Sequence, residues 1–305
     1  MNFRRNLKIN ELEKFKKYFE YYNLYLCKEG REALLESAEK ICADEDLCAE
    51  ALRVKNKLAD LSFYFTSEEF DKEFKDKSAQ FGAFVFTLAI EGMEKIYEEK
   101  NITRDIFIDT IGDLAVWINR HHDWTGEWGF TQHGWIIHHI RGRLFKLGRL
   151  QFEMSNVKFE EWDSPSENLK ANLKNGDPFL SVHIPRGGKL DEAACIESFE
   201  RAKRFFPRVI GYDFKAFGCF SWLFDPAFED LLPPESNILK FQRLFPARWT
   251  YEREAYWGLD YVFVNITKEN IKDAPTDTYF RKKLVEHILS GGIMRSGGGF
   301  RLNNK

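Results

Sequence analysis

The sequence predicts an α+β protein in which an all-helical N-terminal domain precedes a domain of alternating strands and helices. Apolar residues recur at helical spacing from residue 10 to about residue 121, and this stretch contains no proline. After residue 143 the apolar stretches become short, rich in β-branched or aromatic residues and bounded by Gly, Pro or Asp, which is typical of strands. We therefore expect a helical domain at residues 1–125 and a mixed α/β domain at residues 126–305.

The helices of the first domain follow from the spacing of its apolar residues. In the first helix Leu12, Phe15 and Phe19 lie on one face, while lysines and glutamates take the other. Thr103 is placed to cap the last helix, because its hydroxyl can accept a hydrogen bond from a free amide. Helices are expected at residues 10–26, 29–41, 45–65, 81–100 and 103–120.

The second domain is predicted to be a sheet with helices packed on it, because strands and helices alternate along the chain. No repeat, low-complexity segment or long linker interrupts the sequence, so the boundary near residue 125 is a compact connection. Strands are expected at residues 146–154, 178–185, 217–224 and 257–266, and helices at residues 190–206, 236–245 and 276–292.

Composition and charge argue against several classes of partner. The chain has 305 residues and a formal net charge of -3, so it has no global basic field that would attract nucleic acid or anionic lipid. Its longest apolar run, residues 81–90, is shorter than the roughly 20 residues that cross a bilayer. The cysteines form no C-x-x-C pair, which fits reduced thiols. We expect a soluble cytoplasmic protein with no nucleic-acid or membrane partner, and its oligomeric state stays open.

A histidine-rich stretch, residues 121–139, is the first candidate for chemistry. Two histidines on a helix reach one zinc ion when they are three or four residues apart. His133 and His138 are five apart, which directs them about 140° apart around a helix, and adjacent histidines diverge as well. We expect these side chains to cap helix ends or to stack on nearby tryptophans, and we expect no metal. The stretch contains His121, His122, His133, His138 and His139.

Asp105, Asp109 and Asp113 are spaced i, i+4 on one face of a predicted helix. Converging carboxylates can hold a cation or share a proton. Such a stripe is more often a solvated face, and its first member lies where the helix dipole favours negative charge. A solvated face is therefore the favoured interpretation.

Familiar catalytic motifs are absent from the sequence, which has no G-x-S-x-G elbow, P-loop or G-x-G-x-x-G fingerprint. Cys219 and Ser221 lie two apart on a predicted strand and share one face of it. If that face lines a pocket, the pair supplies a thiol and a hydroxyl for proton transfer. If it faces the core, both are small buried fillers, and we favour this second interpretation.

Residues 180–190, LSVHIPRGGKL, form a predicted strand and turn before a helix. Alternation places Ser181 and His183 on one strand face, and ligands of α/β sheets bind at such strand ends. Adjacent glycines allow left-handed backbone and close approach of an anion, and Arg186 can donate charge-assisted hydrogen bonds to a phosphate. Asp191 and Glu192, however, can cap the following helix themselves and repel a phosphate. The pattern therefore fits a phosphate-binding turn or a tight corner.

Several ordered stretches of the second domain, FKLGRLQFE, LSVHIPRGGKL, ESFERAKRFF and CFSWLFDPAFEDLLPPESNILKFQRLF, resemble a bacterial two-domain N-acyltransferase family. In that family a helical N-terminal domain precedes a GNAT-like C-terminal domain. The resemblance covers most of residues 126–305 and implies transfer of a short acyl group from acetyl-CoA or another acyl-CoA to an amine of a small molecule or peptide. It also implies that the helical domain covers the acceptor side, with an acceptor pocket near residues 117–139.

The resemblance assigns residues to the coenzyme. The sheet of GNAT domains opens between two neighbouring strands, here 178–185 and 217–224, and the turn after the first holds the pyrophosphate. The usual Q/R-x-x-G-x-G/A phosphate motif is not met, because Gly187 and Gly188 are adjacent. Asn237 matches an asparagine that often starts the next helix. The implied coenzyme-binding residues are Val182, His183, Ile184, Arg186, Gly187, Gly188, Lys189 and Asn237.

The chemistry implied by the family needs a base for the amine and an acid for the leaving thiolate. Glu153 or His183 can act as the base, directly or through water. Phe241 and Phe245 stand where the family often has a tyrosine acid, so Cys219 is the nearest candidate donor. Two other hypotheses remain: a non-catalytic acyl-CoA sensor that keeps the fold, and a zinc-dependent hydrolase that uses the histidine-rich stretch.

Overall fold

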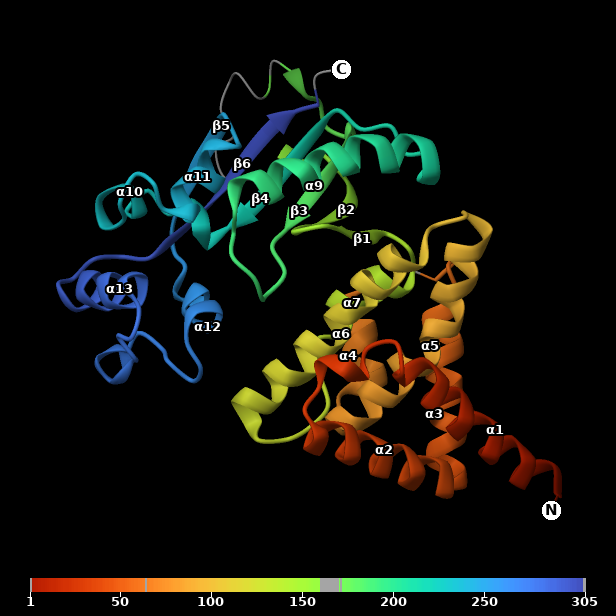
Figure 1. The fold of residues 1–305 in the computed structure, drawn as a ribbon. Coiled ribbons are helices and arrows are strands. Elements are labelled where there is room, and N and C mark those ends of the chain that lie inside the picture. The colour runs from red at the N-terminus through yellow and green to blue at the C-terminus, as the bar shows by residue number, and fades with distance from the viewer. Residues whose placement is uncertain (1, 64, 160–169, 171, 304–305) are drawn as a thin grey trace. The chain divides into compact units, whose positions relative to one another are not determined.

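The computed structural model of the chain describes residues 2–63, 65–159, 170 and 172–303. The chain divides into two compact units: Met1–Lys146, the helical unit, and Leu147–Lys305, the sheet unit. Helices build the first, and a mixed sheet with helices builds the second, as Figure 1 shows. The predicted α+β class is confirmed.

Local capping sets the helix starts of the helical unit. Asp44 accepts a hydrogen bond from the amide of Leu47 at 3.0 Å and so caps α3. Thr103 stands at the start of α6 but makes no capping hydrogen bond through its side chain, so the predicted contact is wrong. The helices of this unit are α1 (Asn2–Phe19), η1 (Asn23–Tyr25), α2 (Lys28–Ala43), α3 (Glu45–Ala59), α4 (Ser67–Phe74), α5 (Ala79–Glu99), α6 (Arg104–Thr125) and α7 (His133–Ile140).

The predicted helix at 45–65 is shorter than expected, because α3 ends at Ala59. The carboxylate of Asp60 accepts hydrogen bonds from the backbone amide and the hydroxyl of Ser62, at 2.9 and 2.6 Å. Such local side-chain bonds compete with the helix ladder and favour a turn. The chain then re-enters a helix at α4, which the apolar spacing did not predict.

The centre of the helical unit is α5. Its residues from 81 to 90 are all buried, and α1, α2, α3 and α7 pack around it. A helix that is apolar on every side belongs in a core when its length falls short of a membrane span. In the described part of the chain, no helix is long and apolar enough to cross a membrane.

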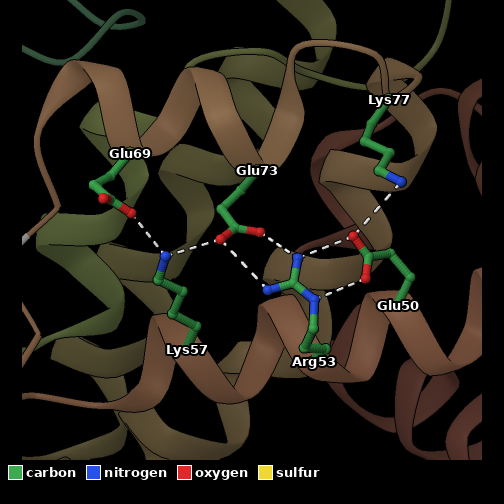
Figure 2. Close-up of polar contacts among 6 residues, drawn as sticks. All are labelled: Glu50, Arg53, Lys57, Glu69, Glu73 and Lys77. Carbon is green, nitrogen blue, oxygen red and sulfur yellow. Dashed lines mark hydrogen bonds and ion pairs between the residues drawn. The ribbon is translucent and has the colours of Figure 1, made fainter.

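A network of ion pairs joins α3 to α4 on the helical unit (Figure 2). Glu73, only 4% exposed, lies between Arg53 and Lys57, and its carboxylate is 2.8 Å from Lys57 Nζ. The hydrogen bond from Arg53 is the main reason that the pKa of Glu73 lies below its usual value. The network comprises Glu50, Arg53, Lys57, Glu69, Glu73 and Lys77, so its positive and negative side chains balance.

The sheet has the strand order β1-β2-β3-β4-β6-β5. Strands β3 and β4 run parallel, whereas β2 with β3, β4 with β6, and β5 with β6 run antiparallel. The strands are β1 (Leu144–Leu147), β2 (Leu150–Asn156), β3 (Pro178–His183), β4 (Ala216–Ser221), β5 (Ala247–Glu254) and β6 (Arg295–Leu302).

Helix α9 (Glu192–Phe205) covers one face of this sheet (Figure 1). Its Phe199 ring packs edge-on against Phe152 of β2 and Phe217 of β4, with centroids 5.9 and 4.7 Å away. On the opposite face Phe179 of β3 contacts Phe220 of β4. Aromatic residues thus pack on both faces of the sheet.

Three strand predictions need correction. Residues 257–266 are not a strand: they form η5 (Tyr256–Gly258) and α12 (Leu259–Val262), because Leu259, Val262 and Phe263 bury the face that a helical period defines. The predicted strand at 146–154 is a β1–β2 hairpin that turns at Gly148. The strand at 217–224 passes into η4 (Trp222–Phe224) after Ser221.

Strands β5 and β6 were not predicted. The glycine run of β6 lowers its strand propensity, but the glycines fit where side chains cannot. A Cβ on Gly298 would lie 2.4 Å from the Trp249 ring, and one on Gly299 would lie 2.7 Å from Phe224. The absence of side chains therefore lets these rings closely approach β6, which lies between β4 and β5. The remaining helices are η3 (Phe206–Ile210), α10 (Phe228–Leu231), α11 (Asn237–Arg243), η6 (Ile271–Asp273) and α13 (Tyr279–Leu289).

Candidate functional site

The parallel pairing of β3 with β4 stops before either strand ends. It runs from Phe179 opposite Ala216 to Ser181 opposite Gly218. Beyond this point β3 stays paired with β2 up to His183, and β4 stays paired with β6 up to Ser221. Beyond Ser181 and Gly218, β3 therefore stays paired with β2 and β4 with β6, while β3 and β4 are no longer paired with each other. The two strand ends therefore part at the same level as His183.

Glu153 and His183 meet on one face of the sheet. Glu153 of β2 lies opposite Ser181, and His183 lies opposite Gln151, so the two side chains are diagonal neighbours. His183 Nε2 is 3.1 Å from Glu153 Oε2. The side chains are 29% and 16% exposed, so the pair stays accessible. The register of two antiparallel strands therefore joins residues that are 30 positions apart in the sequence.

Two further polar groups near this pair were missed by the sequence analysis. Gln151, opposite His183, is 1% exposed, and in the described residues its Nε2 has no hydrogen-bond partner. Arg149, in the β1–β2 turn, contacts the turn that follows β3. Alternation along β2 places Gln151 and Glu153 on one face, which is a signal that the sequence did offer.

The predicted phosphate turn, residues 185–189, is here named the RGG turn. Gly187 and Gly188 both adopt left-handed backbone, with φ of 89° and 73°. A Cβ at either position would meet nothing within 4 Å, so the backbone there is open to a ligand. Arg186 and Lys189 are exposed. Among the described residues, the amides of Gly187 and Gly188 have no hydrogen-bond acceptor, which suits an anion site.

The side chain of Arg149 contacts the main-chain carbonyls of this turn. Its guanidinium donates to the carbonyl oxygens of Lys189, Pro185 and Gly188 at 2.9, 3.0 and 3.4 Å. Burial lowers the pKa of the guanidinium from its usual value. The backbone amide of Arg149 in turn donates to Ser198 Oγ of α9 at 2.9 Å. The turn, the hairpin and α9 are thereby joined through one residue, Arg149.

The start of α9 is already capped by protein. Asp191 Oδ1 accepts a hydrogen bond from the amide of Ala194 at 3.0 Å. One of the amides that a helix start offers to an anion is therefore occupied, as the sequence led us to expect. An anion at this place would bind mainly through the RGG turn and its cations.

Cys219 lies apart from the Glu153–His183 pair. Gly218 shares the face of Ser181, so the next residue, Cys219, faces α9 on the other side of the sheet. The residue is 1% exposed, and burial raises the pKa of its thiol. Its position fits the buried filler that we favoured and weighs against a proton donor beside His183.

The helix that follows β4 offers no tyrosine either. Phe241 and Phe245 are buried against each other and against Phe224. Asn237 is the first residue of α11 and is exposed, and Ser236 caps that helix by accepting from the amide of Leu239 at 3.3 Å. Val182 and Ile184 flank His183, one of them buried and the other half-buried.

The histidine-rich stretch serves the packing of the helical unit. His122 stacks on Trp128 with ring centroids 3.7 Å apart, which confirms the predicted stacking. His133 stacks instead on Phe74 at 3.8 Å, and burial lowers its pKa to about 4. In the described part of the chain, no three His, Cys, Asp or Glu side chains gather as a metal site would require.

Asp113 does not belong to a solvated face, so that prediction is wrong for this residue. It is 5% exposed and accepts hydrogen bonds from Trp117 Nε1 at 3.2 Å and Trp135 Nε1 at 2.8 Å. His139 Nε2 lies 3.2 Å from the same oxygen. The i, i+4 spacing of the three aspartates does not predict the burial of Asp113, because the N–H donors come from Trp117 of α6 and Trp135 of α7.

A mixed sheet with one parallel pair that parts beside a glycine turn fits one class of protein, the GNAT-like acyltransferases. The chain belongs to the family of two-domain N-acyltransferases, as its sequence led us to expect. Residues 20–142 match the N-acyltransferase N-terminal domain, and residues 144–301 match the GNAT-like C-terminal domain, which by itself spans more than half of the chain. Comparison with curated proteins gives no match.

Solved structures of acyltransferases share the fold. One, in complex with decanoyl-CoA and teicoplanin, has a TM-score of 0.69 and 22% identity, covering 88% of this chain and 84% of that chain. Another, in complex with CoA and 10C-teicoplanin, has the same score and identity and covers 91% of this chain and 88% of that chain. A tryptophan-to-alanine variant in complex with octanoyl-CoA also has a TM-score of 0.69 and 22% identity, covering 90% and 88%.

Proposed function

We propose that the protein transfers a short acyl group from an acyl-CoA to an amine of a small molecule or peptide. The observation that carries this proposal is the parting of β3 and β4 beyond Ser181 and Gly218, directly beside the RGG turn. Unpaired strand edges offer amides and carbonyls to the amide groups of pantetheine, as in strand addition. The RGG turn would take the pyrophosphate on the amides of Gly187 and Gly188, with Arg186 and Lys189 as cations.

The pair of Glu153 and His183 would prepare the amine. An ammonium group must lose a proton before its nitrogen attacks the thioester carbonyl. His183 accepts that proton, directly or through water, and Glu153 at 3.1 Å orients the ring and stabilises its charge. The carbon–nitrogen bond forms as the carbon–sulfur bond breaks, and the nitrogen releases its second proton to solvent. CoA leaves as a thiolate that takes up a proton from solvent or from the imidazolium. Proximity of the two substrates supplies much of the remaining rate.

The acyl-CoA complexes among similar structures support the donor, and the teicoplanin complexes support an amine acceptor of small-molecule or peptide type. Octanoyl- and decanoyl-CoA in those proteins set the range of donors worth testing. We include Asn237 in the coenzyme site only by family resemblance, and assign Val182 and Ile184 to it as neighbours of the parting strands.

The direct test is release of CoA thiol from donors between acetyl- and decanoyl-CoA in the presence of a panel of amines that includes teicoplanin. A protein-only blank corrects for the exposed thiol of Cys27. We expect amine-dependent release that His183→Ala lowers about 100-fold, while CoA affinity stays within about twofold. The variant His287→Ala, a histidine of α13 outside the proposed site, should keep the turnover of the wild type.

Other outcomes decide between the remaining hypotheses. Tight CoA binding without release for any amine would favour the non-catalytic acyl-CoA sensor. Absence of CoA binding at millimolar concentration would contradict the proposed function altogether.

A further inference from the structure

We propose that Arg149 is a positioning residue for the coenzyme: it holds the RGG turn with its amides outward and supplies the positive charge beneath the phosphate. This inference rests on the proposed function and extends it to a residue outside the turn. Arg149 belongs to the β1–β2 hairpin, so neither the family motif nor the turn itself includes it.

The first argument is the direction of the hydrogen bonds. A peptide group that turns its carbonyl oxygen towards one side presents its amide to the other. Arg149 takes the carbonyls of Pro185, Gly188 and Lys189, so these oxygens are held on the guanidinium side of the turn. The amides of the same peptide groups, which belong to Arg186, Lys189 and Leu190, are turned to the other side, next to the open amides of Gly187 and Gly188. A phosphate would otherwise meet the same carbonyl oxygens and be repelled. The contact therefore selects the orientation that an anion needs.

The second argument is charge. In the described residues, no carboxylate lies within ion-pair distance of Arg149, whose polar partners are main-chain carbonyls. A half-buried guanidinium that keeps its full charge is costly unless that charge serves a partner. Arg53 of the helical unit is neutralised by Glu50 and Glu73, whereas Arg141 of that unit, like Arg149, donates to three main-chain carbonyls. What distinguishes Arg149 is that its turn also carries two open glycines. A diphosphate at the RGG turn would supply the missing negative charge.

The third argument is rigidity. The amides of Arg149 and Leu150 donate to Ser198 Oγ at 2.9 and 3.3 Å, and that hydroxyl donates to the carbonyl of Ala194 at 2.8 Å. A Cβ on Gly148 would lie 3.1 Å from the same oxygen, and its φ is 82°. The hairpin that carries Arg149 is thus fixed to α9, so the Arg149 side chain holds the RGG turn in a defined position relative to that helix.

Calorimetric titration with two ligands tests the proposal: CoA, and S-decanoylpantetheine, which lacks the pyrophosphate and nucleotide. We expect Arg149→Gln to weaken CoA binding by at least about tenfold and S-decanoylpantetheine binding by less than about twofold. The salt dependence of CoA binding should also be smaller in this variant. Arg208→Gln, an exposed arginine of the same unit, makes the same charge change and should leave both affinities unaltered.

A second variant covers the case in which Arg149→Gln does not fold. Arg149→Lys keeps the charge but cannot hold three carbonyls at once, so CoA affinity should fall to an intermediate value with pantetheine binding intact. Equal losses for both ligands, or CoA binding unchanged in Arg149→Gln, would overturn the role of Arg149. Failure of the wild type to bind CoA would instead contradict the proposed function.

Discussion

The buried carboxylates of the helical unit and the guanidinium of Arg149 in the sheet unit are compensated differently, and the comparison separates packing from function. In the helical unit Glu73 and Asp113 are buried, and basic or polar side chains of the same unit contact each carboxylate. In the described part of the sheet unit, the guanidinium of Arg149 has only carbonyl partners, and the adjacent RGG turn carries exposed cations. A compensated charge stabilises a fold, whereas an uncompensated one beside open amides fits an external anion.

The Glu153–His183 pair tests this comparison most strongly, because a role in fold stability alone would contradict it. We expect Glu153→Gln to lower turnover about 100-fold, because the amide cannot stabilise a protonated imidazole. CoA affinity and melting temperature should hardly change. Steady-state kinetics with the best donor and amine, together with thermal denaturation, measure both. A fall in melting temperature with turnover intact would assign the pair to packing.

Asp113 should show the opposite behaviour. Asp113→Asn keeps one oxygen that can accept from the indole N–H groups of Trp117 and Trp135, but it removes the charge that strengthens both hydrogen bonds and leaves an amide group in a buried site. We expect a loss of about 3 kcal/mol in the free energy of unfolding of the helical unit, measured by urea titration, with CoA affinity retained. Asp109→Asn, one helical turn earlier, is the matched control and should cost much less. Equal effects at both positions would remove the special place of Asp113.

His133 gives the helical unit a pH dependence. Burial lowers its pKa to about 4 from the ordinary value of 6.5, so between these values the unfolded chain binds more protons than the folded one. The free energy of unfolding should therefore fall as the pH drops from about 6.5 to 4, by roughly 2 kcal/mol at pH 5 from this residue. His133→Phe keeps the stacking on Phe74 and should remove that part of the slope. A variant with the slope of the wild type would contradict the assignment.

The network around Glu73 should have the smallest effect, because Arg53 is half exposed and keeps Glu50 as a partner. We expect Glu73→Gln to cost about 1 kcal/mol at pH 7. The pKa of Glu73 is lowered in the fold, so this contribution is present above the unfolded pKa and is lost as the pH falls through the folded pKa. Glu68→Gln, an exposed neighbour on α4, is the control for thermal denaturation.

The periodicity of apolar residues predicted the helices and strands better than local residue composition did. The apolar run at 81–90 gave α5 within a residue or two of its true bounds, because a fully buried helix leaves a continuous signal. Residues 257–266 were mistaken for a strand on their aromatic and β-branched content, although Leu259, Val262 and Phe263 already had helical spacing. The glycines kept strand β6 from being predicted, because the reason for them is the close approach of aromatic rings from other elements.

The site could be predicted only where it is local in the sequence. The RGG turn and His183 lie within one short stretch, so the sequence alone could propose them as site residues. Glu153 was a candidate, but its contact with His183 depends on a strand register that the sequence does not specify. Arg149 and Gln151 escaped notice, because the interaction of Arg149 spans 36 to 40 residues and the burial of Gln151 is a tertiary property.

Calorimetric titration of the protein with CoA and acetyl-CoA tests the central claim most directly, repeated on the variant Arg186→Ala, Gly188→Glu. Gly176→Glu is the control, since Gly176 also has left-handed backbone with open space around it. The account predicts binding to wild type and to the control, and loss of binding in the double variant. Binding that survives in the double variant would place the coenzyme elsewhere, and no binding to the wild type would contradict the acyl-CoA-dependent function.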